Sequence, residues 1–284
     1  MVKWTFEHFP GRGVCNQVVK EAAGHSDIVR WLYHFNYGRD DDDTMKAAMA
    51  RGDMELARWL HRVRRIPIRG EEMAAANGHL NMLQMLLRGR QIPPGVMVKP
   101  AESGHLDIIR WLVPSWEDGR TVLAMDEAAS NGHLDIVQWL HSNRTEGCTS
   151  DAMDLAAANG HLEMVQWLHA HRSESCTTNA MDGTAFGGHF EVVKWLHFAH
   201  TNAGCTTGAM NYAARMGHLD VVKWLHLNRS EGCTTEAMDG AAENGHLEIV
   251  KWLHCMRIEG CTLDAMNLPA SNGHLSIVKW LHRH

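Results

Sequence analysis

The sequence predicts an all-α solenoid of about ten helix–turn–helix repeats. Three observations predict it. The dipeptide Gly-His recurs nine times, and a tenth copy reads Gly52-Asp53, with 26 to 29 residues between successive glycines. Tryptophan recurs at the same spacing from Trp31 to Trp280, which explains most of the 11 tryptophans. Between these markers, apolar residues are spaced as in helices and are separated by turn residues.

The first helix of each repeat, helix A, is clearest at residues 150–159. Thr149 precedes it and can cap its free N–H groups. The small pair Ala156-Ala157 lets this helix lie close to its neighbour, and Gly160 ends it in a backbone conformation that glycine tolerates best.

The second helix, helix B, follows each Gly-His pair. In residues 133–141 the apolar side chains form one wide stripe, whereas Asp135, Gln138 and His141 lie on the other side. Turn residues 142–147 end this helix. Trp139 belongs to the stripe, so the tryptophan column is expected in the core. A single repeat is too small to bury its own stripe, and stacking stabilises it.

We expect one repeat domain over residues 1–284, degenerate in 1–118 and regular in 119–284. Val2-Lys3-Trp4 matches the end of the last helix B, which predicts a lone B helix before ten A–B pairs. The last helix B presents its apolar stripe at the end of the stack, where terminal repeats normally present a polar face. We therefore expect either that a partner covers this end or that the chain is a fragment.

The degenerate repeats contain unusual segments. Arg39–Asp43 and Gln91–Gly95 are expected to be linkers. Helix A contains Pro100 in one repeat and Pro269 in another, so both helices are expected to be short or kinked.

The segment Ala152–Leu168 resembles the ankyrin repeat, in which helix A, a glycine turn and helix B follow in this order. The usual period is about 33 residues, and here it is mostly 28. The missing residues fall between helix B and the next helix A, where ankyrin repeats carry a β-hairpin finger. The resemblance thus implies an ankyrin-like α-solenoid with short loops in place of the fingers. It also implies binding of a protein partner through the helix A and loop face.

Composition argues against several other classes. The net charge of −6 disfavours non-specific binding of nucleic acid. No apolar run reaches the roughly 18 residues that a membrane helix needs, and the N-terminal residues lack the apolar core of a signal peptide. Seven cysteines form no plausible secreted disulfide framework. We expect an intracellular, cytoplasmic monomer that binds neither nucleic acid nor membrane.

The histidine and cysteine columns are expected to be structural. The histidine after each glycine should pack and form hydrogen bonds across the turn between repeats, and the column at His141 should lie exposed at the end of helix B. Three or four converging ligands are needed to bind zinc, and no such set is evident. Cysteines of the column are too far apart for disulfides and are expected under the turns, as are Cys15 and Cys255. The column comprises Cys148, Cys176, Cys205, Cys233 and Cys261. No catalytic residue, metal or cofactor is expected.

Two further columns are polar. Asp126, Asp154, Asp182 and Asp239 are expected to accept hydrogen bonds from N–H groups of a neighbouring turn. The pair Arg144 and Glu146, with its copies, is expected to be solvated linker chemistry.

Residues that differ between repeats are the candidates for partner binding, since residues that hold the stack must recur. Two positions before the turn glycine the residue varies, and large side chains gather in two neighbouring repeats; a loop there also contains an extra residue. Aromatic residues, Met and Arg are enriched at interface hot spots. The predicted partner-binding residues are Phe186, Tyr212, Arg215, Met216, Glu243, His200 and Asn202.

The sequence therefore favours a non-catalytic scaffold for protein–protein interaction. Two alternatives stay open. The chain is the recognition part of a larger protein whose effector domain is absent here, or it is a repeat protein that binds metal through histidine and cysteine.

Overall fold

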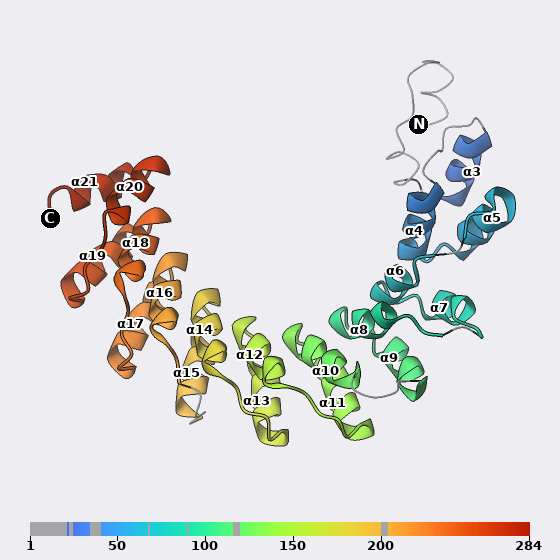
Figure 1. Ribbon diagram of the computed structural model, residues 1–284, viewed down its shortest axis with the longest axis horizontal. Coiled ribbons are helices and arrows are strands. Elements are labelled where there is room, and N and C mark those ends of the chain that lie inside the picture. Colours follow the sequence, from blue (N-terminus) through green and yellow to red (C-terminus); the bar gives the residue numbers. More distant parts are fainter. Residues whose placement is uncertain are drawn as a thin grey trace, which may run out of the picture. The chain divides into compact units, whose positions relative to one another are not determined.

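The computed structural model describes residues 22, 25–34, 41–67, 69–89, 91–115, 120–199 and 204–284. The chain divides into two compact units, Met1–Glu117 and Asp118–His284 (Figure 1). The boundary falls where the degenerate repeats give way to the regular ones. The expected single domain over 1–284 stays a prediction.

Unit 1 contains one B helix followed by three A–B pairs within its described residues. Its helices are α3 (Ser26–His34), α4 (Asp41–Arg51), α5 (Met54–Arg64), α6 (Glu71–Ala76), α7 (Leu80–Leu86), α8 (Pro94–Glu102) and α9 (Leu106–Leu112), and the 3-10 helix η2 (Val113–Ser115) follows. The lone B helix expected at Val2–Trp4 lies outside the described residues.

Unit 2 contains six A–B pairs. They are α10 (Arg120–Ser130) with α11 (Leu134–Asn143), α12 (Ser150–Ala158) with α13 (Leu162–His171), α14 (Thr178–Gly187) with α15 (Phe190–Phe198), α16 (Thr207–Met216) with α17 (Leu219–Asn228), α18 (Thr235–Glu243) with α19 (Leu247–Met256), and α20 (Asp264–Ser271) with α21 (Leu275–Leu281). No strand occurs in the part of the chain that the structure describes. The predicted helical solenoid with short connecting loops is confirmed.

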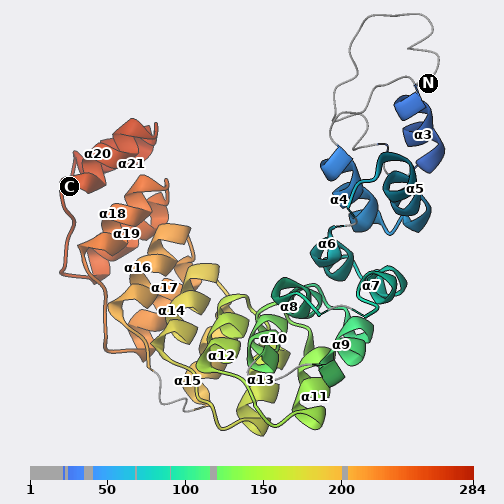
Figure 2. The same ribbon diagram turned by 45° about the vertical axis from the view of Figure 1, so that its right-hand side comes forward.

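The A helices of unit 2 lie side by side in one row and the B helices in another (Figures 1 and 2). Neighbouring A helices pack more closely than neighbouring B helices. Small side chains permit this approach: a Cβ added to Gly183 in α14 would lie 2.8 Å from the Cβ of Ala158 in α12. The A row therefore sets the spacing of the repeats.

The same positions of each repeat fill the core. In α12, Ala152, Met153, Ala156 and Ala157 are buried, and in α13, Met164, Val165 and Leu168. Equivalent residues are buried in the other repeats of unit 2, the last repeat retaining fewer of them. Burial of these apolar side chains contributes about 25 cal/mol per Å² to stability.

The tryptophans differ from the prediction, since Trp139, Trp167 and Trp224 are half-buried rather than buried in the core. The indole lies at the edge of the apolar stripe. Its ring there contacts the preceding repeat instead of the core of its own repeat. There the ring of His141 contacts that of Trp167 edge-on, with 5.2 Å between ring centroids. The same contact joins His169 to Trp195, His197 to Trp224, His226 to Trp252 and His254 to Trp280. The expected exposure is confirmed for His61, His169, His254 and His282, whereas it is wrong for His141, His197 and His226, which are half-buried.

The histidines of the Gly-His pairs bridge successive repeats, as predicted. Nε2 of His79 lies 2.9 Å from the carbonyl oxygen of Ala50, and Nε2 of His218 lies 3.1 Å from that of Phe186. Because a carbonyl only accepts, Nε2 is the donor. Burial lowers the pKa of His189 and of His246, and the neighbouring histidines lower both further.

These half-buried histidines predict lower stability in mild acid. The unfolded chain takes up protons near pH 6.5, whereas His189 and His246 in the folded protein do so only at lower pH. Stability is therefore lost as the pH falls through this window. We expect the melting temperature at pH 5.5 to be a few degrees below that at pH 7.5. Circular dichroism at constant ionic strength measures this, and an equal or higher value at pH 5.5 contradicts it.

Two predicted linkers are partly helical. The helix α4 begins at Asp41, within the segment Arg39–Asp43, because acidic residues stabilise a helix N-terminus. The helix α8 begins at Pro94, since proline suits the first turn of a helix. Of the two helices with an internal proline, α20 has only eight residues, whereas α8 has nine, as many as α12, and is not shortened.

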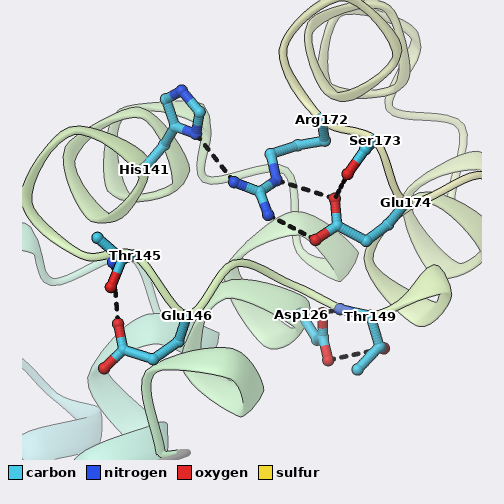
Figure 3. Close-up of polar contacts among 8 residues, drawn as sticks. All are labelled: Asp126, His141, Thr145, Glu146, Thr149, Arg172, Ser173 and Glu174. Carbon is cyan, nitrogen blue, oxygen red and sulfur yellow. Dashed lines mark hydrogen bonds and ion pairs between the residues drawn. The ribbon is translucent and has the colours of Figure 1, made fainter.

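The aspartate column joins each A helix to the turn before the next. The Thr149 backbone N–H donates to Oδ1 of Asp126 at 2.9 Å, and its hydroxyl donates to Oδ2 (Figure 3). The Thr149 hydroxyl also accepts from the N–H of Asp151 and so caps α12. The contact recurs at Asp154, Asp182 and Asp239, so the predicted role is confirmed. Burial raises the pKa of Asp126, and this effect outweighs the hydrogen bonds from Thr149, which lower the pKa.

The Arg–Glu pairs were expected to be solvated. They are instead half-buried between repeats. Arg172 is 16% exposed, and its Nε donates to Glu174 at 3.1 Å (Figure 3). Its Nη1 lies 3.3 Å from Nδ1 of His141 in the preceding repeat. The absence of a side chain at Gly147 makes this possible, because a Cβ there would overlap the guanidinium. The bond from Arg172 lowers the pKa of Glu174.

Most of the cysteine column is buried, as predicted: Cys148, Cys176, Cys205 and Cys233. Burial raises the pKa of Cys148 and of Cys205 to about 11, so these thiols are protonated at neutral pH. The prediction is wrong for Cys255 and Cys261, which are exposed. Within the described residues no further A–B pair covers Cys261, and Cys255 lies in the last turn of α19. Cys15 lies outside the described residues.

Candidate protein-binding face

The A helices of unit 2 carry a stripe of residues that differ from repeat to repeat, and all of them except Gly240 are at least partly exposed. In α12 the stripe consists of Asp151, Leu155 and Ala158, which share one side of the helix because they are four and three residues apart. The equivalent residues are Leu123, Glu127 and Ser130 in α10; Asn179, Gly183 and Phe186 in α14; Gly208, Tyr212 and Arg215 in α16; Glu236, Gly240 and Glu243 in α18; and Asp264, Leu268 and Ser271 in α20. We call this surface the A face.

Five of the predicted partner-binding residues lie together at the centre of the A face. Phe186 lies in the last turn of α14, next to the α16 residue Tyr212, and their rings meet edge-on with 6.1 Å between centroids. Their exposed fractions are 47% and 43%, and Met216 is 42% exposed. A large ring that stays half-exposed in a stack of small residues is available for contact with another molecule.

Arg215 and Glu243 continue the cluster towards α18. Nη2 of Arg215 lies 3.8 Å from Oε2 of Glu243, and the arginine side chain is 49% exposed. Its stem covers Gly240, where an added Cβ would lie 3.0 Å from Nε. Gly208 makes similar room for Tyr212, whose Cε2 would lie 3.2 Å from a Cβ there. Small residues in the stripe thus leave room for the large side chains. His200 and Asn202, also predicted here, lie outside the described residues.

The exposed charges of the A face are mainly acidic. Asp151, Glu236 and Asp264 are exposed, and Glu127 and Glu243 are half-exposed. Arg215 is the single basic residue among the stripe positions of unit 2. Nδ2 of Asn211 donates to Glu236 at 3.1 Å and holds that carboxylate at the start of α18.

Sequence comparison agrees with this geometry of paired helices, glycine turns and an exposed helix A. A family described as ankyrin repeats (many copies) matches residues 99–141 and 125–169, and one described as ankyrin repeats (3 copies) matches residues 180–267. The chain belongs to the ankyrin repeat family. Ankyrin repeats are generally modules for protein–protein interaction. No curated protein matches this ankyrin repeat chain significantly.

Sequence reasoning missed the glycines of the A face in this ankyrin repeat protein. Gly183, Gly208 and Gly240 lie inside helices, where glycine costs about 1 kcal/mol relative to alanine. Their departure from the repeat pattern next to Phe186, Tyr212 and Arg215 was the available signal.

Two further features of the described residues concern metal binding and membranes. No group of three or more His, Cys, Asp or Glu side chains there is placed to hold a metal ion. Among the helices so described, none combines the length and the apolar character that crossing a bilayer requires.

Proposed function

We propose that this ankyrin repeat protein is a non-catalytic scaffold that binds a protein partner through the A face. The observation that carries the proposal is the contact of Phe186 with Tyr212, flanked by Arg215 and Met216. These large, partly exposed side chains gather where the repeat pattern breaks. They are also the residue types that dominate binding energy at interfaces.

We further propose that the chain acts as a monomer in the reducing cytoplasm. The thiols of Cys148, Cys205 and Cys233 support the reducing compartment, because they are buried in the stack and form no disulfide. Oxidising compartments favour cysteines that are paired in disulfides.

A pull-down from lysate of the source cells tests the proposed face. We expect at least one protein retained by the wild-type chain to be lost with the double variant Phe186→Ala/Arg215→Ala. Loss of one hot-spot side chain costs about 2 kcal/mol or more, roughly thirtyfold in affinity.

Leu227→Ala is the matched control, because Leu227 is a large side chain, 79% exposed, on the B helix α17. Circular dichroism should show that all variants are folded. If every retained protein binds the double variant as well as it binds the wild type, the proposed face is wrong.

A further inference from the structure

We infer that the segment bound by the A face is basic and carries a central apolar anchor: an extended stretch of a partner protein with Lys or Arg on both sides of a large aliphatic or aromatic side chain. This inference rests on the proposed function. It adds the chemistry of the partner, which the exposed aromatic cluster alone does not define.

The charges of the A face are the first observation that supports a basic segment. Acidic side chains lie on both sides of the aromatic cluster: Glu127 and Asp151 towards α10, and Glu236 and Asp264 towards α20. The charge of Arg215, the single basic side chain of the stripe, is partly balanced by Glu243 at 3.8 Å. A partner that covers the face therefore meets a surplus of negative charge, and basic side chains complement it.

The surplus is larger on this face than on the B helices. On the B helices of unit 2, two ion pairs are formed, Lys194 with Glu191 and Lys251 with Glu248. The helices α11 and α13 each carry one acidic residue and no lysine or arginine, whereas α17 and α21 each carry a lysine. In the turns, each arginine pairs with a glutamate of its own repeat, as Arg172 does with Glu174. Summed over unit 2, the B helices and the turns are thus nearly balanced in charge, and a basic segment gains most by lying along the A helices.

The aromatic cluster at the centre of the A face is the observation that supports an apolar anchor. Phe186 and Tyr212 expose ring surface, and Met216, one helical turn after Tyr212, adds an exposed side chain with a flexible thioether. Towards α12, the neighbouring stripe positions are Ala158 and Gly183, which carry no side chain larger than a methyl group, and Leu155 beyond them is 43% exposed. An apolar side chain can therefore contact Phe186 and Leu155 without displacing a large residue.

The spacing of the helices sets the length of the segment. Four helix spacings of roughly 8–10 Å separate α12 from α20, or about 32–40 Å in all. An extended chain advances about 3.3 Å per residue, so about 10–12 residues span the acidic ends. One anchor near the middle of such a segment would lie over Phe186 and Tyr212.

A displayed library of random peptides of about 12 residues, panned against the full chain, tests the inference. We expect enriched peptides to carry a net positive charge on both sides of an apolar residue. Measured by fluorescence polarisation, their affinity should fall by about tenfold or more in the variant Asp151→Asn/Glu236→Gln/Asp264→Asn, because three attractive charges are removed. It should also fall between about 0.1 M and 1 M salt, as the Debye length shrinks from ~10 Å to ~3 Å.

The matched control changes the same charge on the other row of helices, in Asp135→Asn/Glu163→Gln/Asp220→Asn. These three residues are exposed at the starts of α11, α13 and α17. The control should leave the affinity within about twofold of wild type, since charges beyond a Debye length are largely screened. A loss as large as that of the A-face variant would overturn the inference by showing that only total charge matters.

The remaining outcomes separate this inference from the proposed function. Neutral or acidic peptides that lose affinity with Phe186→Ala would overturn the charge requirement and leave the proposed face in place. Enriched peptides that bind Phe186→Ala as tightly as wild type would overturn both. A library without any binder would overturn recognition of a linear basic segment, while the pull-down still decides the proposed function.

Discussion

Replacing Gly160 by alanine is expected to lower the free energy of unfolding by about 3–4 kcal/mol. Gly160 ends α12 with φ +80°, where a Cβ costs about 1–2 kcal/mol. That Cβ would also lie 2.5 Å from Nδ1 of His189 in the next repeat. The imidazole would have to leave its hydrogen bond to the backbone of Ala158, and an unpaired buried group costs about 1–3 kcal/mol. Urea denaturation of the full chain measures the sum.

The chain contains the control for this substitution. Gly273 has the same φ of +80°, but a Cβ there would meet nothing within 4 Å, so Gly273→Ala should cost only the strain of about 1–2 kcal/mol. In a His189→Ala background, Gly160→Ala should likewise cost only that strain, because the clash is gone. Equal costs for Gly160→Ala and Gly273→Ala in the wild-type chain would show that the histidine moves aside freely.

The sequence predicted those features of the fold that recur in every repeat. The positions of Gly160 and Thr149 predicted where α12 ends and begins. The contact of Asp126 with the next turn and the bridging role of His79 followed from the fact that each recurs at a point where two repeats meet. Features of this kind are determined by backbone groups that must be satisfied at every turn.

The features that sequence missed depend on which side of a helix the next repeat covers. Trp167 belongs to the apolar stripe, yet it lies at the edge of that stripe and contacts His141 rather than the core. Arg172 is charged and lies in a turn, yet Gly147 of the preceding turn gives its guanidinium a half-buried site. The pattern within one repeat does not reveal contacts that arise only between two.

The residues of the candidate site could be predicted from the sequence, but their contacts with one another could not. Comparing the repeats with one another identified Phe186, Tyr212 and Arg215 as departures from the pattern. Their mutual contacts, and the glycines that make room for them, follow from the distance between adjacent A helices. That distance is a tertiary property.

The aspartates that link the repeats supply the second large expected effect. Replacing Asp154 by alanine should lower the free energy of unfolding by about 2–3 kcal/mol, because it removes the acceptor for both the N–H and the hydroxyl of Thr177. The N–H of Thr177 donates to Oδ1 of Asp154 at 2.8 Å. Because Asp154 is only 4% exposed, water does not readily replace the lost carboxylate as the acceptor.

Asparagine at the same position should cost less than about 1 kcal/mol, and the chain itself gives the reason. In α16 the column holds Asn211, whose Oδ1 accepts from the N–H of Thr234 at 2.9 Å while its Nδ2 donates to the hydroxyl at 2.8 Å. Asp154→Asn can form the same pair of bonds with Thr177, and it removes a carboxylate whose pKa is raised by burial. The two variants thus separate the hydrogen bonds from the charge. If asparagine destabilises as much as alanine in urea denaturation, the carboxylate charge stabilises the link, and the bonding pattern of Asn211 does not transfer to α12.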